Sequence, residues 1–218
     1  MHKVLIFVAH PDDEVLGCGA TIAKHIDNSD MVQIVFLSDG FSSRNDDENR
    51  DSNAQKASKV LACQNPIFLN YPDNQLNTVP LLDIVKKIET IVSDFQPNII
   101  YTHYFGDLNI DHQITHKAVI TACRPQPNFC VKEIYSFEVL SATHWQSPSM
   151  SNAFNPNYFV DVSDFIKQKI KALKCYDNEM RDYPHARSYE AVASLSSFRG
   201  SSVGVHNAEA FVIERLIK

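Results

Sequence analysis

Near its N-terminus the chain reads Val8-Ala-His-Pro-Asp-Asp-Glu14, directly after an apolar run from Val4 to Val8. That run is too short for a helix, so we predict a buried strand that ends in several ionisable groups. His10 and Asp13 lie three positions apart at the expected strand-to-helix turn. They can therefore direct one nitrogen and one oxygen at a shared metal ion, while Asp12 remains free for proton transfer.

A simpler interpretation is that Asp12 or Asp13 only caps the helix that follows, because Asp is a favoured N-cap residue. This interpretation accounts for one carboxylate of the three in the segment. Loops at the carboxyl ends of strands are also where α/β proteins bind ligands. We therefore interpret the segment as one half of a functional site.

The composition bounds the class of protein. With 218 residues, 44% of them hydrophobic and 21% charged, the chain is typical of a soluble globular protein, and we expect residues 1–218 to form a single domain. No apolar run approaches the length of a membrane span. The 26 acidic residues outnumber the 20 basic ones, and no basic cluster indicates a nucleic-acid interface. A small-molecule partner is favoured.

Cysteine usage and the N-terminus indicate a cytoplasmic location. The five cysteines are odd in number, widely scattered and without a Cys-x-x-Cys pair, which is typical of reduced thiols. The apolar stretch Val4 to Ala9 is shorter than the core of a secretory leader and leads straight into charged residues.

The first half of the chain alternates strand and helix patterns. Further strands are predicted at Met31 to Leu37, Pro66 to Leu69 and Asn98 to Thr102. Helical spacing is found between them, at Val15 to Ile26, around Ala54 to Leu61, and at Leu81 to Val92. This order predicts an α/β fold with a largely parallel sheet and helices on both faces.

The second half is less regular. Lys132 to Val139 and Tyr158 to Val162 are predicted strands, and Ser163 or Asp164 is a candidate cap for a helix after the second. We expect a loop at Gly200 to Gly204, whereas the period of Glu209 to Ile217 does not distinguish a helix from a strand.

A second polar cluster, from Tyr104 to His112, follows the predicted strand that leads to His103. Because the ends of parallel strands face one side of a sheet, His112 can approach His10 and Asp13 across about a hundred residues of sequence. Two histidines and one aspartate make three protein ligands. That number leaves a position open for water, as in catalytic rather than structural zinc sites.

Three further residues near the proposed ligands could contribute to the site in other ways. His116 forms a His-x-x-x-His pair with His112, but a solvent-facing position is the better interpretation, so it ranks below Asp13 as a ligand. His103 is expected to support the ligands rather than bind the metal. Asp111 either holds the imidazole of His112 or caps its helix.

The segments Ala9-His-Pro-Asp-Asp-Glu14 and Asp107-Leu-Asn-Ile-Asp-His112 resemble those of the zinc-dependent N-deacetylases of the PIG-L or LmbE-like family. The resemblance extends to Arg50 and to Ala208-Glu-Ala-Phe211. It implies a Rossmann-like fold and hydrolysis of the N-acetyl group of an N-acetylglucosamine unit. It further implies His10, Asp13 and His112 as zinc ligands, Asp12 as general base and Arg50 near the substrate. Homo-oligomers occur among such proteins.

One departure from the family pattern concerns Asn109, since many members have a histidine three positions before the last ligand. An Asn amide can donate a hydrogen bond to an oxyanion, but it cannot deliver a proton at neutral pH. The leaving amine then takes its proton from Asp12 or from another histidine. The candidates are His144, His185 and His206.

The sequence is also compatible with two other functions. A metal-dependent phosphoester hydrolase also gathers His and Asp at strand ends, although two-metal sites usually need more carboxylates. A catalytically silent sugar-binding relative is the other, and the presence of Asp12 argues against it. For substrate contacts we name Tyr104 and His144 besides Arg50. The polar stretches Ser42–Asp51 and Ser147–Asn157 are expected to act as lids.

Overall fold

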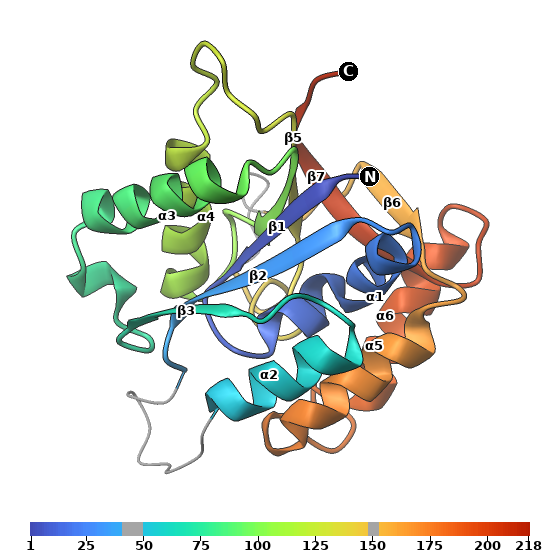
Figure 1. The fold of residues 1–218 in the computed structure, drawn as a ribbon. Coiled ribbons are helices and arrows are strands. Elements are labelled where there is room, and N and C mark those ends of the chain that lie inside the picture. Colours follow the sequence, from blue (N-terminus) through green and yellow to red (C-terminus); the bar gives the residue numbers. More distant parts are fainter. Residues whose placement is uncertain (41–49, 148–152) are drawn as a thin grey trace.

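The computed structural model describes residues 1–40, 50–147 and 153–218 of the chain. Within these residues, seven strands form one sheet in the order β3-β2-β1-β4-β5-β7-β6 (Figure 1). The first five strands in the sequence run parallel, and β7 pairs antiparallel with β5 and β6. The predicted α/β class with a mostly parallel sheet is confirmed. The strands are β1 (Lys3–Val8), β2 (Met31–Ser38), β3 (Ile67–Tyr71), β4 (Ile99–His103), β5 (Glu133–Phe137), β6 (Tyr158–Asp161) and β7 (Ala208–Leu216).

Helices cover both faces of the sheet (Figure 1). Successive residues of β1 alternate between two hydrophobic cores, since Ile6 belongs to one and Phe7 to the other. Helices α3 and α4 pack over the core that contains Phe7, and α1, α2, α5 and α6 pack over the other. The helices are α1 (Asp13–Asp27), α2 (Arg50–Val60), α3 (Leu81–Phe95), α4 (Ile110–Ala122), α5 (Ile166–Leu173) and α6 (Tyr189–Ser201), with short 3-10 turns η1 (Leu76–Thr78) and η2 (Lys174–Glu179).

In the second half, the structure decides one segment that the sequence left open and corrects the start of an expected loop. Residues Glu209 to Leu216, whose period was ambiguous, belong to strand β7. The expected loop at Gly200 begins two residues later, because Gly200 and Ser201 are the last turn of α6. Gly200 serves a close approach rather than a turn, since a Cβ there would lie 2.7 Å from the Val205 carbonyl oxygen. Residues 42–49 of the first expected lid and 148–152 of the second lie outside the described residues.

Helix α1 is interrupted at Cys18, whose φ of −145° is not helical. A buried ion pair satisfies the backbone groups that the interruption leaves free. The ammonium of Lys169 donates to the Leu16 carbonyl at 2.8 Å and to Glu209 at 2.6 Å. The Glu209 carboxylate in turn accepts the backbone N–H groups of Ala20 and Thr21 at 3.1 and 2.6 Å. Residues of α5 and β7 thus hold α1 in the orientation that places its first turn.

Replacing Glu209 by Ala should strongly destabilise the fold. The change leaves the ammonium of Lys169 buried without its counter-charge and frees two helix amides, and breaking a buried pair typically costs about 3–5 kcal/mol. Urea unfolding of the purified protein measures this change in the free energy of unfolding. Lys218→Ala removes a pair whose lysine is 78% exposed and serves as the control, with an expected effect of about 1 kcal/mol or less. A Glu209→Ala protein as stable as the Lys218→Ala protein would contradict the proposed role of the pair.

The strand order explains where a site can form. Strand β1 lies between β2 and β4, and the chain leaves β1 toward α1 on one face and β4 toward α4 on the other. The two loops diverge at the carboxyl ends of neighbouring strands, which is the place where open α/β sheets bind ligands. Among the described residues no helix is both long and apolar enough to cross a lipid bilayer.

Candidate active site

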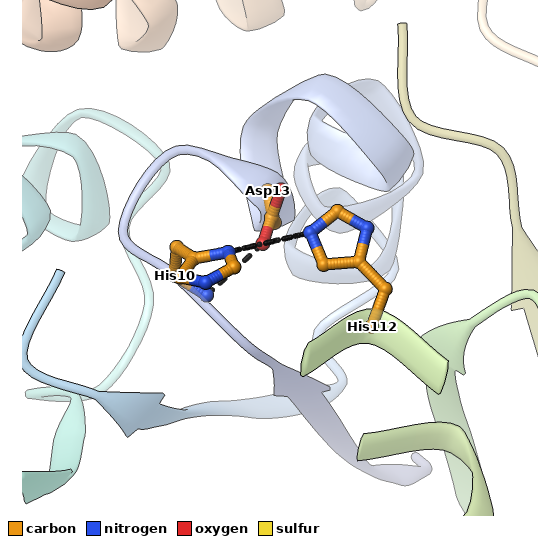
Figure 2. Close-up of side chains that lie close together, drawn as sticks. All are labelled: His10, Asp13 and His112. Carbon is orange, nitrogen blue, oxygen red and sulfur yellow. Dashed lines mark hydrogen bonds and ion pairs between the residues drawn. The ribbon is translucent and has the colours of Figure 1, made fainter. Parts of the chain in front are cut away.

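Three side chains from the two diverging loops converge on one point (Figure 2). His10 follows β1, Asp13 opens α1, and His112 lies in the first turn of α4. The Asp13 carboxylate oxygen Oδ2 is 3.2 Å from His10 Nδ1 and 3.2 Å from His112 Nε2, and the two nitrogens are 3.3 Å apart. All three residues are buried. The structure therefore brings together the three residues that the sequence singled out as ligands.

The triangle of donor atoms fits a tetrahedral cation. With bonds of about 2.0–2.2 Å to nitrogen and oxygen, two ligands of a tetrahedral zinc ion lie about 3.3–3.5 Å apart. The three observed separations of 3.2–3.3 Å are close to that spacing. Two imidazoles and one carboxylate also leave the fourth position for another molecule. The residues present thus suit a divalent ion with an open coordination position.

The electrostatics of the triangle favour positive charge. Burial alone lowers the pKa of both histidines, but hydrogen bonds to Asp111 and Asp13 raise the pKa of His10 to about 9. The charges of Asp13 and Asp107 raise the pKa of His112 to about 10 against the same effect of burial. Burial opposes ionisation of Asp13 as well, yet the surrounding imidazoles hold its pKa well below the usual range. The negative charge around the two imidazoles therefore favours a positive charge at this point of the pocket.

Asp107 sets the orientation of His112. One of its oxygens, Oδ2, lies 3.2 Å from His112 Nδ1 and accepts the Thr143 hydroxyl at 2.7 Å. The other accepts the Asn109 backbone N–H at 2.8 Å. A ligand histidine usually donates its second N–H to such a carboxylate, which fixes the tautomer and turns the other nitrogen to the metal. The sequence pattern offered Asp111 for this role, and the structure gives it to Asp107.

Asp111 and Asp73 support His10 instead. Their carboxylates lie 3.2 and 3.3 Å from His10 Nε2, on the side of the ring away from Asp13. Asp111 also accepts the Leu76 backbone N–H at 3.0 Å, which ties η1 to α4. Because both carboxylates face the same nitrogen, we interpret them as acceptors of its N–H rather than as ligands of a second ion.

Replacing Asp107 by Asn should weaken metal binding without removing a ligand. Loss of a carboxylate behind a ligand histidine typically lowers metal affinity about 10–100-fold, because the imidazole becomes less basic and less well oriented. Titration of the metal-free protein against a fluorescent zinc chelator measures the change. Asp94→Asn, at an exposed position of α3, is the matched control. Equal affinities for the two variants would remove Asp107 from this role.

Asp12 does not act as a helix cap, although it occupies the N-cap position of α1. Its φ is 126°, a conformation that residues other than glycine rarely adopt, and its side chain makes no capping hydrogen bond. The carboxylate instead accepts a hydrogen bond from the Arg187 guanidinium at 2.8 Å. Burial raises the pKa of Asp12, and the charge of Arg187 offsets only part of that rise. Backbone strain of this kind is concentrated at functional sites.

Arg187 is the neighbour of Asp12 that the sequence analysis missed. It lies 175 residues after Asp12 in a loop without a recognisable motif, so no local pattern points to it. The Glu179 carboxylate lies 3.9 Å from Arg187 and forms a second ion pair with Arg50. Arg50, predicted to lie near the substrate, is only 5% exposed and links α2 to η2 through Glu179.

Asn109, Tyr104 and His144, the other predicted site residues, have identifiable contacts. Asn109 caps α4, since its side-chain oxygen accepts the Asp111 N–H at 2.8 Å. Tyr104 is 4% exposed and donates its hydroxyl to the Ala153 carbonyl at 2.8 Å. His144 has a side chain that is 35% exposed and lies 3.0 Å from a Glu138 carboxylate oxygen. Their catalytic or substrate-binding roles stay predictions.

His103 and His116 do not complete the triangle. His103 Nε2 accepts the Ala9 backbone N–H at 2.9 Å, so its lone pair is already used, and its ring stacks on His112 with centroids 3.9 Å apart. His116 has a 13% exposed side chain and faces Glu214 at 3.4 Å, so it is less solvent-facing than expected.

Comparison with known proteins extends these findings. The chain is 29% identical over 177 residues to the uncharacterized deacetylase YaiS of Escherichia coli, covering 78% of this chain and 88% of the relative. The N,N'-diacetylchitobiose deacetylase of Pyrococcus horikoshii has the same fold, with a TM-score of 0.80, 23% identity, and coverage of 98% and 84% of the two chains. The 4-carboxy-2-hydroxymuconate hydratase GalB of Pseudomonas putida also has this fold. Its TM-score is 0.77 at 19% identity, and the match covers 100% of this chain and 99% of GalB.

The hydratase shows that this fold alone does not decide the reaction, which has to be argued from the site. The sequence match to a family model is more specific than the fold. Residues 5–123, more than half of the chain and both halves of the site, match the model described as GlcNAc-PI de-N-acetylase. The chain therefore belongs to the PIG-L family.

Proposed function

We propose that this protein is a zinc-dependent N-deacetylase, which hydrolyses the N-acetyl group of an amino sugar or its glycoconjugate to acetate and a free amine. The observation that carries the proposal is the buried triangle of His10, Asp13 and His112, together with the buried carboxylate of Asp12, which interacts electrostatically with Asp13 and His10. The donor atoms suit zinc, and Asp12 is the additional carboxylate that such hydrolysis needs as a base. The E. coli relative is also named a deacetylase.

In the proposed reaction, different residues bind the metal, transfer the proton and stabilise the oxyanion. His10, Asp13 and His112 would hold zinc, which acts as a Lewis acid and lowers the pKa of a coordinated water toward about 7. Asp12 removes a proton from the attacking water, and its buried position favours the protonated form that results. In a second role Asp12 returns that proton to the leaving amine. The Asn109 amide is the proposed hydrogen-bond donor to the oxyanion.

Elemental analysis combined with acetate release tests this proposal. Purified protein is expected to contain about one zinc ion per chain, in line with one set of three ligands. It should release acetate from at least one member of a panel of N-acetylglucosamine, N,N'-diacetylchitobiose and N-acetylated sugar nucleotides. Phosphate release without acetate release would favour the phosphoester hydrolase instead. Failure to bind zinc even when it is supplied would contradict the metal assignment.

We also propose the partner, the cellular location and the domain organisation of the enzyme. We propose a small N-acetylated sugar as the partner and no nucleic acid, because acidic residues outnumber basic ones. A cytoplasmic location is supported by the five cysteines, which are all free thiols. One domain over residues 1–218 is supported by the single sheet, to which both halves contribute strands. A homo-oligomer remains compatible with the family.

A further inference from the structure

The two oxygens of the Asp12 carboxylate have different surroundings. Oδ2 accepts a hydrogen bond from Arg187 Nη1 at 2.8 Å. Oδ1 is buried and has no hydrogen-bond partner among the described residues. Burial of an unpaired carboxylate oxygen is costly, and a catalytic role is one of the reasons for which such an oxygen is retained.

The backbone of Asp12 is held independently of its side chain. Its N–H donates to Glu14 Oε2 at 3.1 Å, and the hydroxyl of Tyr176 donates to the other oxygen of Glu14 at 2.6 Å. Glu14 is fully buried, and these bonds accompany the unusual φ of 126° at Asp12. With its backbone fixed, Asp12 can change the direction of its carboxylate only by side-chain rotation, and the Arg187 contact opposes that rotation.

Arg187 is itself anchored on two sides. Its Nε donates to the Ser141 hydroxyl at 3.2 Å, and its backbone N–H donates to His185 Nδ1 at 3.0 Å. A guanidinium is planar, and its nitrogens point in fixed directions, so holding Nε also fixes where Nη1 points. Lysine carries a similar charge on a flexible stem and cannot reproduce both contacts.

We propose that Arg187 is a positioning residue of the deacetylation: it holds Oδ2 of Asp12, so that Oδ1 is the oxygen that receives the proton of the attacking water. The inference rests on the proposed function. The proton moves from the water oxygen to Oδ1, while Arg187 keeps its own protons and its hydrogen bond to Oδ2. Arg187 acts through Asp12 and is not assigned a contact with the substrate.

Steady-state kinetics on the best acetamido sugar of the panel test the proposal, with zinc content and melting temperature measured on the same samples. Arg187→Gln is expected to lower kcat about 10²-fold and to change KM less than about threefold, with zinc content unchanged, because only the proton transfer is impaired. Arg187→Lys should recover part of the loss. Arg181→Gln is the matched control, since Arg181 hydrogen-bonds the Asn178 and Met180 carbonyls of its own segment, and its kcat should equal that of the wild type.

Chemical rescue separates positioning from a structural role. Arg187→Ala should regain activity when millimolar guanidinium chloride is added, whereas sodium chloride at the same ionic strength should have no effect and Asp12→Asn should not respond. Crystal structures of the wild type and Arg187→Gln give a second readout, in which the Asp12 carboxylate is expected to rotate. A wild-type kcat in Arg187→Gln, or a loss of kcat accompanied by loss of zinc, would overturn the inference alone. A wild type inactive on every acetamide would overturn the proposed function, and this inference with it.

Discussion

Asp12→Asn is expected to lower kcat about 10³-fold while the protein still binds about one zinc ion per chain, since general bases typically contribute 10²–10⁴-fold. Asn has nearly the same shape as Asp but cannot take up a proton. The proposed ligands His10, Asp13 and His112 are unchanged by the substitution. Acetate release and elemental analysis on the same sample give the two quantities. The expected combination of retained metal and lost turnover separates proton transfer from metal binding.

A control variant and two possible results for Asp12→Asn test this assignment. Asp164→Asn removes an exposed carboxylate just before α5 that is not among the site residues, and it should retain wild-type kcat. Full activity in Asp12→Asn would exclude Asp12 as the base. If instead the variant lost its zinc, Asp12 would be acting in metal binding, and the roles assigned to Asp12 and Asp13 would have to be revised.

His112→Gln is expected to lose bound zinc and to lower turnover about 10³-fold or more. Removing a carboxylate behind a ligand costs about 10–100-fold in affinity, and removing the ligand itself should cost more. His112 also contributes to packing, because its ring stacks on His103. The measurement is zinc content after dialysis at fixed free zinc, with acetate release from the same protein and circular dichroism to confirm folding.

His116→Gln is the matched control for this change, because it removes a histidine one helical turn further along α4. His116 faces Glu214 rather than the triangle, so this variant should keep its zinc and its activity. The comparison also tests the His-x-x-x-His alternative directly. Loss of zinc in His116→Gln together with retention in His112→Gln would reverse the assignment.

Much of the fold follows from local sequence pattern. The apolar run before His10 forms β1, and the helical spacing from Leu81 to Val92 forms part of α3. These predictions succeeded because hydrophobic period and strand length are local properties. Helix α6 was missed because it buries mainly small or polar residues such as Ser196 and Gly200, which give no clear apolar stripe.

For the candidate site, the sequence supplied the residues and the fold supplied their partners. His10 and Asp13 are neighbours in the sequence, so a local turn is enough to place them together. His112 required only the rule that parallel strands end on one side of the sheet. Asp107, which orients His112, was part of the quoted motif, but the motif does not show that its carboxylate faces His112 rather than solvent.

The sequence by itself determined the type of fold and the chemical character of the site: a mostly parallel α/β sheet, and a His-Asp cluster with a spare carboxylate at a strand end. Only the tertiary structure decided that β1 lies beside β4, that Lys169 and Glu209 support the interrupted α1, and that Arg187 reaches Asp12. The physical reason is that helix and strand patterns depend on neighbouring residues. Sheet order and buried ion pairs depend instead on residues brought together by packing of the whole chain, and these leave no periodic signal in the sequence.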